Sequence, residues 1–407
     1  MPEGWKTETI ENVCRLITSG GTPSRQRPEY FSDESSGIPW LKTQELRDRT
    51  VITTQEFISE LGLKSSSAKL LPRNTVMLAM YGGGTVGDVA ILGKEMTCNQ
   101  ASCAMVVKED VMRPKYLFYW LIHNRDYVIS LASGAAQQNL SARIVRQLKI
   151  SFPPLPEQDR IVDLMASVDG AIDATSQTLA SVRDSLGAFL DQADADESVQ
   201  MDMLASMRSG PSWTSEQESP VPVEGSLPVL GITNTKSGGH LDLSDRRFVA
   251  GVPASAMRLR EDSLIMIRTN GNRSRIGNVY RSVPEIVGHA VSAFQIAIQP
   301  LDPSMSPYIY WMLRAPKMQA MMSDAASGST GLGNIAIGWL KNLALPRMES
   351  EEREDFVNLC ESFHGVHEGL QSKLCSLKHL RSQLLASLLS GHHCIPSSYD
   401  DLLETSA

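Results

Sequence analysis

Arginine and asparagine gather in one short stretch of the chain, "RTNGNRSRIG" (residues 268–277). A guanidinium can donate two parallel hydrogen bonds to guanine, and a carboxamide can pair with adenine in the same way. The stretch is therefore a candidate for contact with DNA bases. The alternative is a solvated hairpin with incidental charges, and both interpretations stay open. The candidate side chains are Arg268, Asn270, Asn272, Arg273 and Arg275.

Further polar side chains in the first half follow apolar runs that are predicted to be strands. The run "IPWL" precedes Lys42, Thr43, Gln44 and Arg47, which are candidates of the same kind. Tyr81 opens a glycine-rich stretch that corresponds to residues 268–277 and lacks its arginines. Those glycines either allow a close approach to phosphate or make a tight turn. Two more arginines are candidates for phosphate contacts, Arg25 and Arg27.

No catalytic constellation accompanies these side chains. The stretch "GGGTVGD" (residues 82–88) has no Gly-Lys-Ser/Thr ending, and no Gly-x-Gly-x-x-Gly motif opens a helix, so nucleotide-binding loops are not indicated. No lysine follows an acidic residue by two positions, as nuclease sites often require, and the hydrolase motifs Gly-x-Ser-x-Gly and His-Glu-x-x-His are absent. The six cysteines include no Cys-x-x-Cys pair, and "GHHC" (residues 391–394) is interpreted as a polar tail. The sequence therefore predicts no catalytic residue, no metal and no cofactor bound by this chain.

The charge of the chain is distributed unevenly. The net charge over all 407 residues is −8. Residues 1–155 hold 18 Lys and Arg against 15 Asp and Glu, and residues 201–347 hold 14 against 11, so each carries +3. The acidity lies in residues 156–200 and 348–407, at −8 and −6. The two large basic segments permit contact with DNA without demanding it. No apolar run is long enough for a membrane span and no signal peptide is evident, so we expect a cytoplasmic protein.

Each acidic segment predicts one long helix with an apolar seam. In the first, residues repeat at alternating spacings of four and three, the pattern of a coiled coil. The first seam is Ile161, Met165, Val168, Ile172, Thr175, Leu179, Val182, Leu186 and Phe189. The second is Phe356, Cys360, Phe363, His367, Leu370, Leu374, Leu377, Arg381, Leu384 and Leu388. A helix with one apolar stripe needs a partner in water, so we expect the two to pair as an antiparallel coiled coil.

The two basic segments resemble each other. "YLFYWLIHN" (residues 116–124) matches "YIYWMLRAP" (308–316), and "LLPRNTVMLAMYGGG" (70–84) matches "RLREDSLIMIRTNGN" (258–272). Short β-rich runs alternate with turns and few helices, which is typical of an α+β fold. The sequence predicts a duplication of a globular domain followed by a spacer helix. The predicted boundaries are 1–155 and 197–347 for the domains, 156–196 and 348–391 for the helices, and 392–407 for a tail.

This organisation resembles the DNA-specificity subunit of type I restriction–modification systems. The resemblance rests on "ITSGGTPSR" (residues 17–25), "IPWLKTQEL" (38–46), "GDVAILGKEMTCNQASCAM" (87–105) and "GAAQQNLSARIVRQLKISFPPLPEQDRIV" (134–162). It is weaker in the second half, where "PPLPEQ" corresponds to "LPRMESEE". Gln137, Gln138 and Asn139 lie in the last of these motifs and have either a structural role or a role in DNA contact.

The resemblance implies a non-catalytic subunit that recognises a bipartite, asymmetric site on double-stranded DNA. Each domain would be a target-recognition domain, and the helices would hold the two domains apart and dock partner chains. Those partners would be two methyltransferase subunits, which use S-adenosylmethionine, and a restriction and translocase subunit, which uses ATP and Mg²⁺. The span from Glu157 to Leu190 is 34 residues, or ~50 Å of helix, against ~34 Å for one turn of B-DNA.

Two alternatives stay open on the sequence alone. The first is a protein-interaction scaffold that does not read DNA, because a surplus of +3 in each large segment is small. The second is an enzyme whose active site is assembled from scattered residues.

Overall fold

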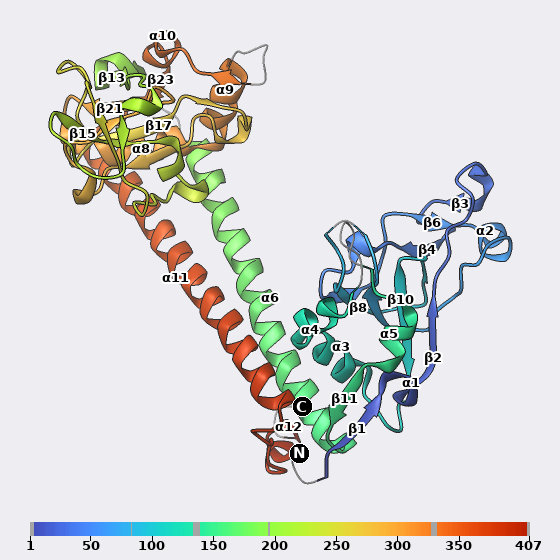
Figure 1. Ribbon diagram of the computed structural model, residues 1–407. Helices are drawn as coiled ribbons and strands as arrows, with labels where there is room; N and C mark the ends of the chain where they lie inside the picture. Colours follow the sequence, from blue (N-terminus) through green and yellow to red (C-terminus); the bar gives the residue numbers. More distant parts are fainter. Residues whose placement is uncertain (1–3, 83, 133–138, 194–195, 327–331, 405–407) are drawn as a thin grey trace. The chain divides into compact units, whose positions relative to one another are not determined.

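The structure, a computed structural model, describes residues 4–82, 84–132, 139–193, 196–326 and 332–404. The chain divides into two compact units, residues 1–175 with 373–407 and residues 176–372. Each unit holds one α+β domain and part of each of two long helices, α6 (Leu155–Gln192) and α11 (Ser350–Leu389). The predicted α+β class and the pair of long helices are confirmed (Figure 1).

Two sheets form the framework of the first domain. The larger has the order β2-β10-β7-β8-β5 and is antiparallel except for the β5–β8 pair. The smaller has the order β3-β6-β4-β9, with β4 and β9 parallel, and β1 pairs with β11. The strands are β1 (Lys6–Thr9), β2 (Cys14–Ser19), β3 (Phe31–Ser32), β4 (Ile38–Leu41), β5 (Arg49–Val51), β6 (Phe57–Ile58), β7 (Val76–Ala79), β8 (Val89–Leu92), β9 (Thr97–Cys98), β10 (Ser102–Val107) and β11 (Lys149–Phe152).

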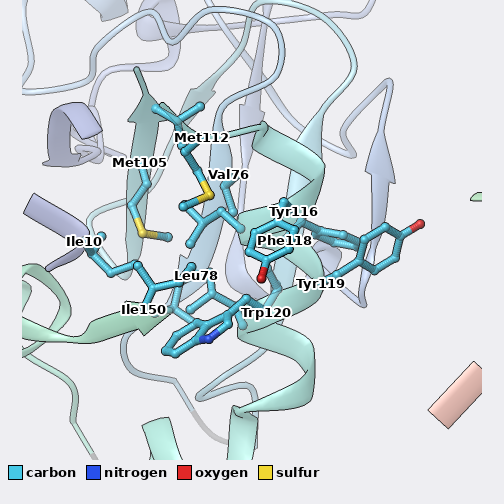
Figure 2. Packing of buried hydrophobic residues seen from close by; sticks show 14 of the residues in the cluster. Ile10, Val76, Leu78, Met105, Met112, Tyr116, Phe118, Tyr119, Trp120 and Ile150 are labelled. Atoms are coloured by element: carbon cyan, nitrogen blue, oxygen red, sulfur yellow. The ribbon is translucent and has the colours of Figure 1, made fainter. Parts of the chain in front are cut away.

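Helix α3 covers one face of the larger sheet and supplies most of the aromatic core (Figure 1). Tyr116, Phe118, Tyr119 and Trp120 on this helix pack in one cluster with residues of β7 and β10, as Figure 2 shows. The aromatic run predicted as a repeat motif is therefore the core-facing helix of the domain. The helices are α1 (Ile10–Val13), α2 (Glu60–Lys64), α3 (Pro114–His123), α4 (Arg125–Ser130) and α5 (Ala142–Gln147), with 3-10 helices η1 (Pro28–Tyr30) and η2 (Thr43–Glu45).

The second domain has a similar framework, in which the larger sheet lacks a counterpart of β5, and this agrees with the predicted duplication. Its sheets have the orders β13-β21-β17-β19 and β14-β16-β15-β20, and β12 pairs with β23. Only the last pair of the second sheet is parallel, as in the first domain. The strands are β12 (Ser198–Gln200), β13 (Ala205–Ser209), β14 (Glu218–Ser219), β15 (Ser226–Leu230), β16 (Arg247–Ala250), β17 (Leu264–Ile267), β18 (Thr269–Asn270), β19 (Val279–Arg281), β20 (Ala290–Val291), β21 (Gln295–Pro300), β22 (Gly333–Asn334) and β23 (Ala344–Pro346).

Helices of the second domain also have counterparts in the first. The aromatic helix α8 takes the place of α3, and its Tyr308 and Trp311 are fully buried. The helices are α7 (Met201–Leu204), α8 (Ser306–Arg314), α9 (Pro316–Ala325) and α10 (Ile337–Lys341), with 3-10 helices η3 (Ser215–Gln217), η4 (Ile232–Asn234), η5 (Ser237–Gly239), η6 (Arg273–Arg275), η7 (Pro284–Ile286) and η8 (Pro303–Met305). Each domain thus has more short helices than the sequence predicts, because single turns of three to five residues carry no periodic signal.

The helix seams are continuous with the domain cores. In the first unit Ile161 and Met165 share one core cluster with Leu385 and Leu388. In the second unit Phe189 stacks on Phe356 with ring centroids 5.4 Å apart. Residue numbers increase along α6 while those of the contacting residues on α11 decrease, so the two helices are antiparallel, as predicted. Every residue of both predicted seams is buried or half-buried.

A buried carboxamide fixes the start of α6 on the first domain. The Gln158 side chain is 0% exposed. Its amide nitrogen donates to the carbonyls of Val111 (3.1 Å) and Pro153 (2.9 Å), and its oxygen accepts from the Arg113 N–H (2.8 Å). The Arg113 guanidinium also donates twice to the Asp159 carboxylate, at 2.6 and 2.8 Å. The "PPLPEQ" step is therefore a joint in which all polar groups of the glutamine are satisfied.

Each domain is also tied to a helix by an aromatic side chain, a carboxylate and an arginine. In the first unit Asp169 on α6 accepts from the Tyr119 hydroxyl (2.9 Å) and from Arg381 Nε of α11 (2.5 Å). Arg381, a charged residue within the second predicted seam, is thus part of an ion pair. In the second unit Glu361 on α11 accepts from Trp311 Nε1 (2.9 Å) and from both terminal nitrogens of Arg281 on β19.

The segment predicted as a polar tail packs on the first unit. Ile395 is buried in its core, and Arg160 of α6 donates to both oxygens of Asp400 at 2.9 and 2.8 Å. The last helix, α12 (Tyr399–Glu404), follows. The start of the second predicted domain (residues 197–347) forms β12 to β14, which end at Ser219. Among the described residues no helix has an apolar stretch suited to crossing a bilayer.

We predict that replacing Gln158 with alanine lowers the free energy of unfolding by about 2–3 kcal/mol, because it leaves buried backbone groups unpaired. Urea-induced unfolding, followed by tryptophan fluorescence, measures the change. The control is Gln177→Ala on the exposed side of the same helix, with an expected change within about 0.5 kcal/mol. Equal unfolding midpoints for the two variants would show that the joint does not depend on Gln158.

Candidate nucleic-acid interface

Four loops of the first domain meet where β10 begins. They are residues 20–27 after β2, 42–48 after β4, 80–82 with 84–88 after β7, and 99–101 after β9; we call them the first loop cluster. Ser19 pairs with Cys103 and Ala79 with Ser102, so the ends of β2 and β7 flank the start of β10. The Asn99 N–H donates to the carbonyl of Leu41 (2.9 Å), which brings the end of β4 to the same edge.

Side chains and close backbone packing hold the first loop cluster together. The Tyr81 hydroxyl donates to the carbonyl of Gln100 (2.9 Å), and the Thr22 hydroxyl donates to the Gln100 side chain. A Cβ added at Gly20 would lie 1.9 Å from the carbonyl oxygen of Cys98, so only glycine fits there. Residues remote in sequence therefore present one surface.

The second domain has the same arrangement at the start of β21. The second loop cluster comprises residues 210–214, 231–236, 268–277 and 292–294. The Ser292 N–H donates to the carbonyl of Leu230 (3.0 Å), and the Arg268 N–H donates to the carbonyl of Phe294 (2.8 Å). Gly210 lies as close to Val291 as Gly20 does to Cys98, with 1.7 Å from its added Cβ to the carbonyl oxygen.

A buried acceptor shapes the same loop in each cluster. The Glu45 carboxylate is 5% exposed and accepts from the N–H groups of Lys42 (3.0 Å) and Gln55 (2.8 Å). In the second domain Asn234 accepts from the Gly231 N–H (2.8 Å) and donates to two carbonyls. The residue before each acceptor, Gln44 or Thr233, is thereby held in an exposed position.

The first-domain candidates fall into three groups. Gln44 and Arg47 are exposed in the first loop cluster. Lys42 and Arg25 both bind the Glu56 carboxylate, at 2.5 and 2.6 Å. The hydrogen bond from Arg25, followed by that from Lys42, lowers the pKa of Glu56, so the Glu56 carboxylate is ionised at neutral pH.

The remaining three first-domain candidates differ in their exposure. Thr43 is 2% exposed, so its side chain is not accessible to a partner. The Tyr81 hydroxyl is engaged by Gln100, and burial raises the pKa of its phenol. Arg27 is exposed at the end of its loop, 3.3 Å from Glu29. The candidate Asn139 is exposed, whereas Gln137 and Gln138 lie outside the described residues.

An ion pair and a hydrogen bond of Arg125 join the loop after β4 to the loop after β7. Arg47 and Asp48 have left-handed backbone angles, φ 48° and 54°, which are unusual for side chains with a Cβ. The Asp48 carboxylate pairs with Arg125, which also donates to the Gly87 carbonyl (3.0 Å). This ion pair holds the loop of Arg47 against the loop after β7.

The arginine- and asparagine-rich stretch of the second domain is a turn held by its own side chains. Asn270 accepts from the Asn272 N–H (2.8 Å), and Asn272 accepts from the Ser274 N–H (3.1 Å) and caps η6. Arg275 is half-buried and donates to the Thr235 carbonyl, while Arg268 Nε donates to that of Ile335 (3.2 Å). Arg273 is exposed.

Sequence reasoning missed polar and aromatic side chains that the fold brings into the clusters. Thr22 and Gln100 join the first, and Trp213, Thr233 and Phe294 join the second. A position-by-position comparison of the two repeats would have identified Thr233 as the counterpart of the candidate Gln44. The others depend on which strands are neighbours.

Among the described residues no group of three or more histidine, cysteine, aspartate or glutamate side chains is placed to hold a metal ion. Burial raises the pKa values of the Cys14, Cys98, Cys103 and Cys360 thiols to about 12, so they are protonated core residues. Cys375 and Cys394 are exposed.

Comparison with known proteins adds family information. Residues 2–183 match the model of the type I restriction modification DNA specificity domain. The MjaIX specificity subunit of Methanocaldococcus jannaschii is 24% identical over 42% of this chain and 40% of its own length. The StySPI specificity subunit of Salmonella potsdam is 20% identical over 96% of this chain and 89% of its own.

A solved structure supports the fold over nearly the whole length. The type I restriction–modification S subunit from M. genitalium aligns with a TM-score of 0.57 at 17% identity. The alignment covers 94% of this chain and 96% of that one. The match to the MjaIX relative spans less than half of that protein, whereas the structural match includes both domains and both long helices.

We predict that Glu45→Ala speeds hydrogen exchange at the amides of Lys42 and Gln55 by about tenfold, because each loses its buried acceptor. Hydrogen exchange read by mass spectrometry on peptides spanning residues 40–57 measures this. Gln44→Ala, at the exposed neighbour, should leave both amides unchanged. If Glu45→Ala had no effect, the shape of the loop would not depend on the buried carboxylate.

Proposed function

Because this chain belongs to the family of type I restriction–modification specificity subunits, we propose that it recognises a bipartite, asymmetric DNA site and directs partner enzymes to it. The observation that carries the proposal is the duplicated loop cluster, each copy built on the same framework. The family is non-catalytic, so methylation and cleavage belong to other chains.

The two loop clusters differ where they are exposed, which supports two different half-sites. Gln44 corresponds to Thr233, and Gln100 corresponds to Ala293, by the register of the neighbouring strands. The buried supports, by contrast, keep their roles, as Glu45 and Asn234 illustrate. A common scaffold with divergent exposed side chains is suited to reading two sequences.

We assign base contacts to exposed side chains of the clusters. In the first domain these are Gln44 and Arg47, with Arg25, Arg27 and Lys42 near phosphates. In the second domain Arg273 and Asn272 are the exposed members of their turn, whereas Arg275 and Arg268 support it. Thr43 is left out, because its burial argues against direct contact.

The expected partners follow from the same proposal. Two methyltransferase subunits would bring S-adenosylmethionine, and a restriction and translocase subunit would bring ATP and Mg²⁺, in the cytoplasm. The acidic helices suit protein partners, because they repel phosphate. In this proposal residues 1–155 and 197–347 are the recognition domains, residues 156–196 and 348–391 the spacer helices and residues 392–407 a C-terminal segment.

Sequencing of methylated bases in the host, with and without the gene, tests the proposal and reports the split motif. With partners added, binding to that motif should weaken steeply as salt rises, because phosphate contacts release counterions. The double variant Gln44→Ala and Arg47→Ala should weaken the base preference at the first half-site. Arg273→Ala should weaken the base preference at the second half-site. If the host without the gene kept every methylated motif, and DNA binding were absent or insensitive to salt, the alternative of a protein-interaction scaffold would be favoured.

A second prediction concerns the spacer. Inserting seven residues into each long helix, after Thr175 and after Ser372, adds about 10 Å of coiled coil. We expect the unspecified spacer of the motif to lengthen by about three base pairs, with both half-sites unchanged. A change within the half-sites themselves would mean that the helices do not set the spacing.

A further inference from the structure

A cavity of about 530 Å³ borders the second loop cluster, and two aromatic side chains are part of its lining. Trp213 and Phe294 line it together with Val229, Ile232 and Ala293. Phe294 is 49% exposed, which is unusual for a phenylalanine in a polar loop. Its backbone carbonyl accepts from the N–H groups of Arg268 (2.8 Å) and Thr269 (3.2 Å), so its position is fixed.

Two residues that line the cavity differ in size from their counterparts in the first domain. Val229 stands in the strand position that Trp40 occupies in the first domain, since each precedes the last residue of its strand and pairs with the parallel neighbour. Valine is the smaller side chain, and Trp213 packs against the cluster that contains it. Phe294 stands where the first domain has Ala101, directly before the central strand. In the first domain the Arg25 guanidinium instead lies over the ring of Trp40, 5.1 Å from its centroid.

The polar lining of the cavity disfavours phosphate. Arg247 pairs with Asp245 (3.0 Å) and lies 3.8 Å from Glu218. Glu218 also accepts from the Trp213 indole nitrogen (2.5 Å). One cation against two carboxylates leaves a net negative lining, so a DNA backbone is repelled there, while an uncharged apolar group is accepted.

Double-stranded DNA presents one apolar group in its major groove, the 5-methyl group of thymine, and phenylalanine is among the side chains that contact it. We propose that the second domain reads a thymine of its half-site by placing this methyl group against Phe294 at the mouth of the cavity. The inference rests on the proposed function and adds a specificity-determining residue to it.

The test uses the full chain assembled with its methyltransferase partners and duplexes of the motif found by sequencing. Each thymine of the second half-site is replaced in turn by deoxyuridine, which removes only the methyl group. At one position we expect affinity to fall about fourfold, the factor for one buried methyl-sized group. In Phe294→Ala the two duplexes should bind equally, and Phe294→Leu should retain part of the preference.

Leu301→Ala is the matched control, because Leu301 is exposed and directly follows β21, whereas Phe294 directly precedes it. It should keep the full preference for thymine. The inference is overturned if the half-site contains no thymine on either strand, if deoxyuridine is tolerated everywhere, or if Phe294→Ala weakens subunit assembly with the preference intact. Failure of the assembled complex to bind any specific duplex would instead overturn the proposed function.

Discussion

The two long helices can exist in water only because their apolar seams are buried, and this constraint organises the chain. A helix with one apolar stripe is unstable alone. Here each helix begins at the end of a domain, and its first turns enter that domain's core, as Ile161 and Met165 do. The second helix then covers the remaining seam. Because domain core and seam form one cluster, each domain is attached to its helix pair by packing.

Hydrogen bonds and ion pairs also connect each domain to the long helices. In both units an aromatic residue at the same position of the core helix, Tyr119 or Trp311, donates to a carboxylate on the long helix that follows. The balancing arginine comes from the opposite long helix in one unit and from a strand in the other. For Glu361, burial alone would raise the pKa, but hydrogen bonds from Arg281 and Trp311 outweigh it and lower the pKa. The Glu361 carboxylate therefore stays charged at neutral pH and keeps its hydrogen bonds to Arg281 and Trp311.

Framework and surface have diverged to different degrees after duplication. The order of four strands in each sheet, the close-packed Gly20 and Gly210, and the buried acceptors Glu45 and Asn234 are common to both domains. The exposed loop residues differ in size and chemistry, as Gln44 with Thr233 and Ala101 with Phe294 show. Substitution at an exposed loop costs little stability, whereas a change at Gly20 or Gly210 would bring a side chain into a backbone carbonyl.

The sequence by itself determined the duplication, the α+β class and both helix seams, because these depend on spacing along the chain, and every seam residue is at least half-buried. Only the tertiary structure decided which polar side chains are available. Arg25 and Lys42 share Glu56, Thr43 is buried and Arg275 supports a neighbouring loop. Gln100 and Phe294 join the clusters through strands distant in sequence. Accessibility depends on which loops are brought together and which charges they already neutralise, and local spacing carries no record of either.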